Sequence, residues 1–172
     1  MFTNILIPLD GTSFAEAEIH HALELLKGVE RARLILTMAI SGPAIPAVPP
    51  LLVNFDQIQT AADRERLQCT VYLQKLMADI KTRRPELTLG YRLAMGTPHQ
   101  VITQVAREEA VDLVIMASHG RSGLERLLSG SITESVVREL ETAVLVVHPE
   151  KAEPGQRSPS FAAAVRDSER AD

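Results

Sequence analysis

Five short apolar runs alternate with segments of helical periodicity, and this alternation limits the possible folds more than any other feature of the chain. The runs cover residues 4–9, 32–40, 87–96, 111–117 and 143–148. Short apolar runs of this kind are typical of strands that are covered on both faces. Strands that alternate with helices join through right-handed crossovers into a mostly parallel sheet. The sequence therefore predicts a doubly wound α/β domain, with an open five-stranded parallel sheet between layers of helices.

Capping signals and periodicity place the helices between these runs. Ser13 and Glu16 have capping-box spacing, which predicts the start of the first helix. Thr97 as N-cap, followed by Pro98 at the first helical position, predicts the start of another. The helices that we expect begin at residues 13, 56, 98 and 132, and the second of them runs to about residue 82. Residues 87–96 alternate between apolar and polar, as a strand near the edge of a sheet does.

Composition and charge exclude several classes of protein. The net charge of −4 argues against a sequence-independent nucleic-acid binder, which needs a basic face. The only cysteine, Cys69, cannot form an intrachain disulfide, and the N-terminal apolar run has no basic segment before it. No apolar run has the length needed to span a bilayer. We therefore expect a cytoplasmic protein without nucleic-acid or membrane partners.

The C-terminal residues differ in composition from the rest of the chain. The segment "EKAEPGQRSPSFAAAVRDSERAD", residues 150–172, is polar and rich in charge, proline and serine. Such a composition has too few apolar residues to join a core. The sequence predicts one domain over residues 1–149 and a disordered tail over 150–172.

The carboxyl ends of the predicted strands are where a ligand is expected. In an open parallel sheet, ligands bind beyond these ends, where the direction of winding reverses. Three stretches fall there: Asp10 with Gly11, Met38 with Ala39, and the loop from Ala117 to Ser131. Asp10 taken alone also fits the plain structural role of capping the following turn or helix.

The loop "ASHGRSGLERLLSGS", residues 117–131, has the composition of a phosphate cradle. Gly130, Ser131 and Ile132 would offer free N–H groups at a helix N-terminus, which favours negative charge. Gly120 and Gly123 permit the positive φ that a nest of N–H groups needs, and the loop arginines, Arg121 and Arg126, add charge. Neither a Walker loop nor the dinucleotide-binding glycine motif is present.

With these residues the chain resembles the universal stress proteins, whose nucleotide-binding members carry Gly, two residues, Gly, nine residues, Gly, then Ser or Thr. The corresponding positions here are Ala117, Gly120, Gly130 and Ser131, so the spacing matches and the first glycine is replaced by alanine. The resemblance also covers "NILIPLDGTSFAEAEI", "GTPHQVI" and "AVLVV", and spans roughly the first 148 residues.

The resemblance implies a Rossmann-like fold of the adenine-nucleotide-binding type. It also implies a regulatory protein of the stress response that binds ATP, together with Mg²⁺, and hydrolyses ATP slowly at most. Asp10 would contact the adenosine part, and Met38 would contact adenine through its backbone. The resemblance also implies a homodimer through the last strand, from Val144 to Val147. The binding residues expected on this basis, with no catalytic residue or metal ligand among them, are Pro8, Asp10, Met38, Ala117, His119, Gly120, Arg121, Gly123, Gly130, Ser131, Ile132 and Thr133.

The alanine in the signature leaves a second function open. The Ala117 methyl group is costly if φ there is positive or if a ligand atom packs against it, and the sequence does not decide this. The alternative is a dimeric interaction module of the same fold that acts without nucleotide. A nucleotidyl transferase or hydrolase has the least support, because no recognisable motif places a carboxylate or a nucleophile near His119.

Overall fold

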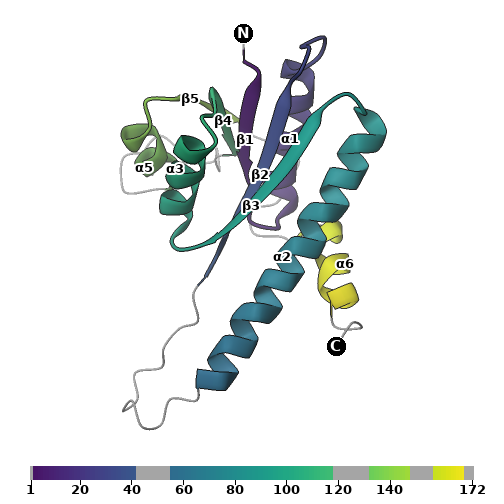
Figure 1. The fold of residues 1–172 in the computed structure, drawn as a ribbon, viewed down its shortest axis with the longest axis vertical. Coiled ribbons are helices and arrows are strands. Elements are labelled where there is room, and N and C mark those ends of the chain that lie inside the picture. The colour runs from purple at the N-terminus through teal and green to yellow at the C-terminus, as the bar shows by residue number, and fades with distance from the viewer. Residues whose placement is uncertain (1, 42–54, 118–131, 148–156, 169–172) are drawn as a thin grey trace.

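The computed structural model describes residues 2–41, 55–117, 132–147 and 157–168, and within them the chain forms a five-stranded parallel sheet (Figure 1). The strands are β1 (Asn4–Pro8), β2 (Arg33–Ile40), β3 (Thr88–Met95), β4 (Leu113–Ala117) and β5 (Ala143–Val147). Their order in the sheet is β3-β2-β1-β4-β5, and every neighbouring pair is parallel. The predicted fold class is confirmed, and β3 lies at an edge as its alternating pattern indicated.

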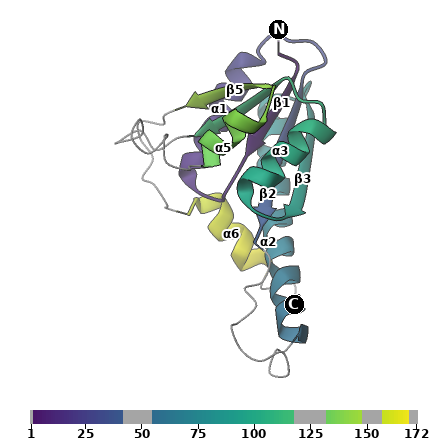
Figure 2. The same cartoon turned by 90° about the vertical axis from the view of Figure 1, so that its left-hand side faces the viewer.

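Helices cover both faces of this sheet (Figures 1 and 2). The helices α1 (Ser13–Leu25) and α2 (Phe55–Arg83) pack on one face, and α3 (Pro98–Glu108) and α5 (Ile132–Glu139) pack on the other. A further helix, α6 (Pro159–Ser168), lies beside α2. No helix in the described part of the chain combines the length and the apolar composition needed to cross a membrane.

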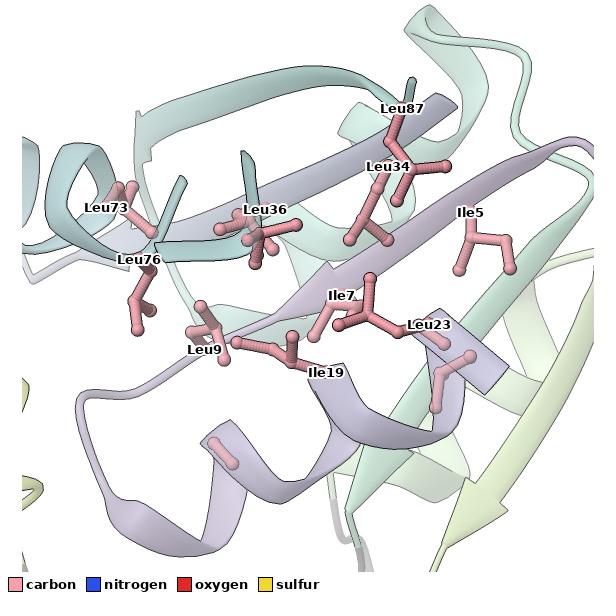
Figure 3. Packing of buried hydrophobic residues seen from close by; sticks show 14 of the residues in the cluster. Ile5, Ile7, Leu9, Ile19, Leu23, Leu34, Leu36, Leu73, Leu76 and Leu87 are labelled. Atoms are coloured by element: carbon pink, nitrogen blue, oxygen red, sulfur yellow. The ribbon is translucent and has the colours of Figure 1, made fainter. Parts of the chain in front are cut away.

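Side chains that alternate along the central strands fill a core on each face. Leu6, Ile35 and Val114 face α3 and α5, whereas their neighbours along the strands face α1 and α2. Figure 3 shows the core on the face of the sheet that α1 and α2 cover, which contains the strand residues Ile5, Ile7, Leu34 and Leu36. Since these strand residues are at most 1% exposed, burial on both faces explains their continuous apolar runs.

The predicted helix starts are close to those observed, with one correction. The N-cap of α1 is Thr12 and not Ser13, because the Thr12 hydroxyl accepts a hydrogen bond from the Ala15 N–H at 3.2 Å. The start of α3 is confirmed: Gln100 Oε1 accepts hydrogen bonds from the Thr97 N–H at 3.4 Å and from the Thr97 hydroxyl at 2.7 Å.

The prediction that all of residues 150–172 form a disordered tail is wrong for the ten residues of α6. Ala164 is fully buried and Phe161 packs against the core that α1 and α2 cover, so a few apolar residues on one helical face are enough to join it. The average composition of the segment concealed this face. The boundary of the domain near residue 149 lies outside the described residues and stays a prediction.

Candidate functional site

The winding of the sheet reverses between β1 and β4, which are neighbours in the sheet but not in the sequence. From β1 the chain goes on to β2 and β3 on one side, and β4 and β5 extend the sheet on the other side. Ile5 pairs with Leu113, so the carboxyl ends of the two strands, Pro8 and Ala117, lie at the same edge. This edge is the place where open α/β sheets bind ligands, and it is where the sequence predicted a site.

Asp10 stands on the turn that joins β1 to α1. Its Oδ1 accepts hydrogen bonds from the Thr12 N–H at 2.9 Å and from the Thr12 hydroxyl at 2.6 Å. Thr12 in turn caps α1, so Asp10 has the structural role of organising this helix start. The Asp10 side chain is nevertheless exposed, which leaves it open to a ligand at the edge. The structural role and a binding role are therefore compatible.

Ala117, the alanine in place of the signature glycine, is the last residue of β4 and pairs with Val147. Among the described residues other than glycine, positive φ occurs only at Arg31 and Ala110. Ala117 therefore has the ordinary extended backbone of a strand, and its methyl group causes no backbone strain there.

Glu18 of α1 also reaches the end of β4, although the sequence analysis did not select it. Its side chain is buried, and Oε1 accepts a hydrogen bond from the Ala117 N–H while Oε2 has no hydrogen-bond partner. Burial raises the pKa of Glu18 well above its ordinary value, the Ala117 N–H lowers it in part, and the nearby Asp10 charge raises it further. The signal was present in the sequence, because Glu18 shares the apolar face of α1 with Ala15, Ile19 and Ala22.

The end of β2 supplies backbone groups to the same edge. Met38 is buried in the core, and its neighbour Thr37 accepts a hydrogen bond from the Leu9 N–H at 2.7 Å. Backbone groups in a parallel ladder point alternately to the two neighbouring strands. Thr37 therefore faces β1, Met38 faces β3, and Ala39 faces the β1 side beyond the point where β1 ends. The sequence analysis placed Ala39 with Met38 at this edge but named only Met38 as a binding residue.

The helix predicted to hold phosphate is α5, which the structure describes from Ile132 onward. The first described residues of α5 are Ile132, which is 46% exposed, and Thr133, which is buried. Since β4 and β5 are parallel neighbours in the sheet, α5 belongs to the crossover that joins them. The remaining predicted residues of the loop, His119, Gly120, Arg121, Gly123, Gly130 and Ser131, lie outside the described residues, as does Arg126.

Arg157 is a further residue at this edge that the sequence analysis missed. Its Nη1 donates a hydrogen bond to the Asp10 carbonyl oxygen at 2.8 Å. The two residues are 147 positions apart, and Arg157 lies in the segment predicted to be disordered. No local pattern of residues could have indicated this contact.

These features define the class of the protein: a doubly wound α/β protein with a polar site at the carboxyl edge, where the winding reverses. A sequence model of the Universal stress protein family matches residues 1–148, and the chain therefore belongs to this family. Universal stress protein MJ0577 of Methanocaldococcus jannaschii is 28% identical over 155 residues, which make up 86% of this chain and 95% of the relative. The solved structure of MJ0577 matches with a TM-score of 0.63 and 27% identity, over 88% of this chain and 99% of that one.

Two other solved structures of the family contain a nucleotide. A universal stress protein in complex with cAMP matches with a TM-score of 0.53 and 20% identity, over 86% of this chain and 97% of that one. A universal stress protein family protein from Arabidopsis thaliana with AMP bound matches with a TM-score of 0.60 and 14% identity, over 87% and 93%. At these identities the likeness establishes the shared fold, and some structural relatives of this chain bind adenine nucleotides.

Proposed function

We propose that this universal stress protein is a regulatory protein that binds ATP at the carboxyl edge of its sheet and hydrolyses it slowly at most. The observation that carries the proposal is the exposed carboxylate of Asp10, held by Thr12 on the β1–α1 turn beside the winding reversal. The nucleotides bound by relatives of the same fold support the choice of an adenine nucleotide.

In this proposal each strand end has one task. Asp10 binds the adenosine part, and the backbone of β2 at Met38 and Ala39 meets the adenine edge. The N–H groups at the start of α5, at Ile132 and Thr133, favour phosphate because the helix dipole is positive there. We assign the phosphate-binding loop to the signature residues, from His119 to Ser131, and Mg²⁺ would enter with the ATP.

The backbone at Ala117 supports this function over a loss of binding. The replacement of the signature glycine is harmful to the fold if φ is positive, and Ala117 lies in β4 with an ordinary strand conformation. The substitution therefore leaves the course of the chain into the signature loop unstrained.

We further propose that two copies pair through β5. This strand lies at an edge of the sheet, with Leu145 37% exposed, and Val137 of the neighbouring helix α5 is 49% exposed. An unpaired edge strand with exposed apolar side chains is a ready surface for association with a second chain. The predicted residues Val144 to Val147 make up most of this strand. A cytoplasmic location also stays a prediction.

The test is a calorimetric titration of ATP–Mg²⁺ into the full chain and into three variants. We expect saturable binding that is weakened at least about tenfold in Asp10→Asn, which keeps an acceptor for Thr12 but removes the charge. Gly130→Val should abolish phosphate binding. Asp79→Ala, which removes an exposed carboxylate on α2, is the matched control and should bind as the unaltered chain does.

The alternative function, a dimeric interaction module without nucleotide, is favoured by one specific observation. Glu18 already occupies the Ala117 N–H with a carboxylate, which is the position an anionic ligand would compete for. Absence of any heat of binding with ATP, together with an intact dimer by light scattering, would establish this alternative and remove the proposed one.

A further inference from the structure

The segment from Arg157 to Ser168, which lies beyond the match to the family model, docks on the turn that carries Asp10. Arg157 Nη1 donates to the Asp10 carbonyl oxygen at 2.8 Å, and the Ser158 N–H donates to the Gly11 carbonyl oxygen at 2.9 Å. Thr12 and Arg157 also form an isolated antiparallel bridge. The segment therefore binds the main chain of the turn at three successive residues.

Aromatic packing holds Arg157 in this position. Its guanidinium carbon lies 4.5 Å from the centroid of the Phe161 ring, which is a cation–π contact. The Phe161 ring in turn meets the ring of Tyr72 edge to face, with centroids 5.1 Å apart and an interplanar angle of 71°. Tyr72 donates a hydrogen bond from its hydroxyl to Glu16 Oε1 at 2.9 Å, in the first turn of α1. These contacts join α6, α2 and the start of α1.

Gly11 is required for this docking for two reasons. Its φ is +78°, a conformation that residues with a side chain adopt at a cost. A Cβ at this position would lie 2.6 Å from Phe161 Cδ2 and 2.8 Å from Arg157 Nη1, well inside contact distance. The turn and the C-terminal segment therefore fit together only because residue 11 has no side chain.

The rest of α6 is anchored on α2, as Figures 1 and 2 show. Ser158 and Ala164 are fully buried, and Lys75 of α2 forms an ion pair with Asp167. The segment thus has its own buried contacts that keep Arg157 at the turn.

The docked segment leaves the Asp10 side chain accessible. Its hydrogen bonds go to the main-chain carbonyl oxygens of Asp10 and Gly11, whereas the Asp10 carboxylate bonds Thr12 and is exposed. The segment therefore holds the backbone of the turn from one side while the carboxylate stays open to the edge of the sheet. The segment also brings the positive charge of Arg157 close to Asp10, and a positive charge attracts an anionic ligand.

We propose that the segment Arg157–Ser168 is a positioning element for the nucleotide site, in which Arg157 fixes the Asp10 turn in its binding conformation. This inference rests on the proposed function, because it gives Asp10 the nucleotide as its ligand. A turn that is already ordered does not lose conformational entropy when the ligand binds. Arg157 is a positioning residue in this proposal and acts on the nucleotide through Asp10.

The experiment compares Arg157→Ala, Arg157→Lys and the matched control Arg166→Ala in the full chain. Arg166 is an exposed arginine of α6, in the same C-terminal segment as Arg157. Without nucleotide, amide exchange at residues 11–15 should accelerate in Arg157→Ala and stay unchanged in the control. ATP affinity should fall about tenfold in Arg157→Ala, since this is the effect of having to order one further residue on binding. Arg157→Lys, which keeps a donor and the charge, should recover part of both losses.

A double-mutant cycle distinguishes positioning from general destabilisation. If Arg157 acts through Asp10, then Arg157→Ala should weaken ATP binding strongly in the unaltered chain and only slightly in the Asp10→Asn background. Equal effects in the two backgrounds would overturn the inference, and so would tighter ATP binding by Arg157→Ala, which would make the segment a competitor of the nucleotide. Phe161→Leu is a second variant, with the same expectations, in case Arg157→Ala does not fold.

The inference and the proposed function fail in different ways. If the unaltered chain binds no ATP, the proposed function itself is contradicted. If the unaltered chain binds ATP, and Arg157→Ala has the same ATP affinity and the same amide exchange, only the role of the C-terminal segment is contradicted.

Discussion

The carboxyl ends of β1 and β4 are neighbours, and a carboxyl side chain lies at each of them, in opposite environments. Asp10, after β1, is exposed and accepts two hydrogen bonds from Thr12. Glu18 of α1, which reaches the end of β4, is 2% exposed and accepts one hydrogen bond from the Ala117 N–H, and its second oxygen has no partner. Burial disfavours the charged form of Glu18 and raises its pKa. The same chemical group is thus open to solvent at one strand end and removed from solvent at the other.

The largest expected effect concerns the packing of Gly11, next to Asp10, against Phe161 and Arg157. Gly11→Ala should lower the free energy of unfolding by about 3 kcal/mol, because positive φ and the clash with Phe161 add together. Gly28→Ala is the matched control: Gly28 has a similar φ of +74° but nothing within 4 Å of an added Cβ, so about 1 kcal/mol should be lost. Equal losses in urea unfolding of the two variants would show that α6 does not press on the turn.

The next effect concerns the Glu18 end and depends on pH. The folded state holds the Glu18 proton more tightly than the unfolded chain, because burial raises the pKa of this carboxyl. The stability of the unaltered protein should therefore fall relative to that of Glu18→Gln as pH rises above about 4.3, the ordinary pKa of glutamate.

Urea unfolding between pH 4 and pH 8 measures this difference, with Glu24→Gln on the exposed face of α1 as the matched control. A difference between Glu18→Gln and the unaltered chain that does not change with pH would mean that the Glu18 carboxyl is not held neutral by its burial.

A smaller effect is expected at Ala117, whose N–H donates to Glu18. Because φ at Ala117 is not positive, Ala117→Gly relieves no backbone strain. The free energy of unfolding should fall by about 0.5–1 kcal/mol, because glycine gives the unfolded chain more conformational freedom. ATP affinity should change by less than about twofold, within the spread of a neutral substitution. Ala94→Gly in β3 is the control for the stability loss. A large gain in affinity would show that the Ala117 methyl group obstructs the ligand.

The smallest effect is expected at the ion pair between Lys75 and Asp167. Their side chains are 39% and 49% exposed, and exposed pairs contribute at most about 1 kcal/mol, reduced further by salt. Asp167→Asn should therefore shift the thermal midpoint only slightly, and less at high salt. A large, salt-dependent loss would show that charge, and not buried packing at Ala164 and Phe161, attaches α6 to α2.

The sequence analysis selected Asp10 for the candidate site and did not select Glu18. Asp10 follows a buried strand closely, so its place at the carboxyl edge could be predicted from the strand pattern alone. Glu18 sits within an apolar helical face, and whether such a residue is buried depends on how closely β4 approaches that face. The capping-box spacing placed the start of α1 one residue too late. Thr12 is the N-cap, and its hydrogen bonds to Asp10 hold it there, which the spacing of Ser13 and Glu16 does not indicate.

The order of strands and helices along the chain, the edge position of β3 and the start of α3 at Pro98 follow from local patterns, because periodicity and capping act over a few neighbouring residues. The docking of Arg157 on Asp10 and the burial of Glu18 against Ala117 join residues 147 and 99 positions apart. Only the folded chain brings these groups together, because packing of α6 on α2 and of α1 on β4 decides which polar atoms are desolvated and which remain open to a ligand.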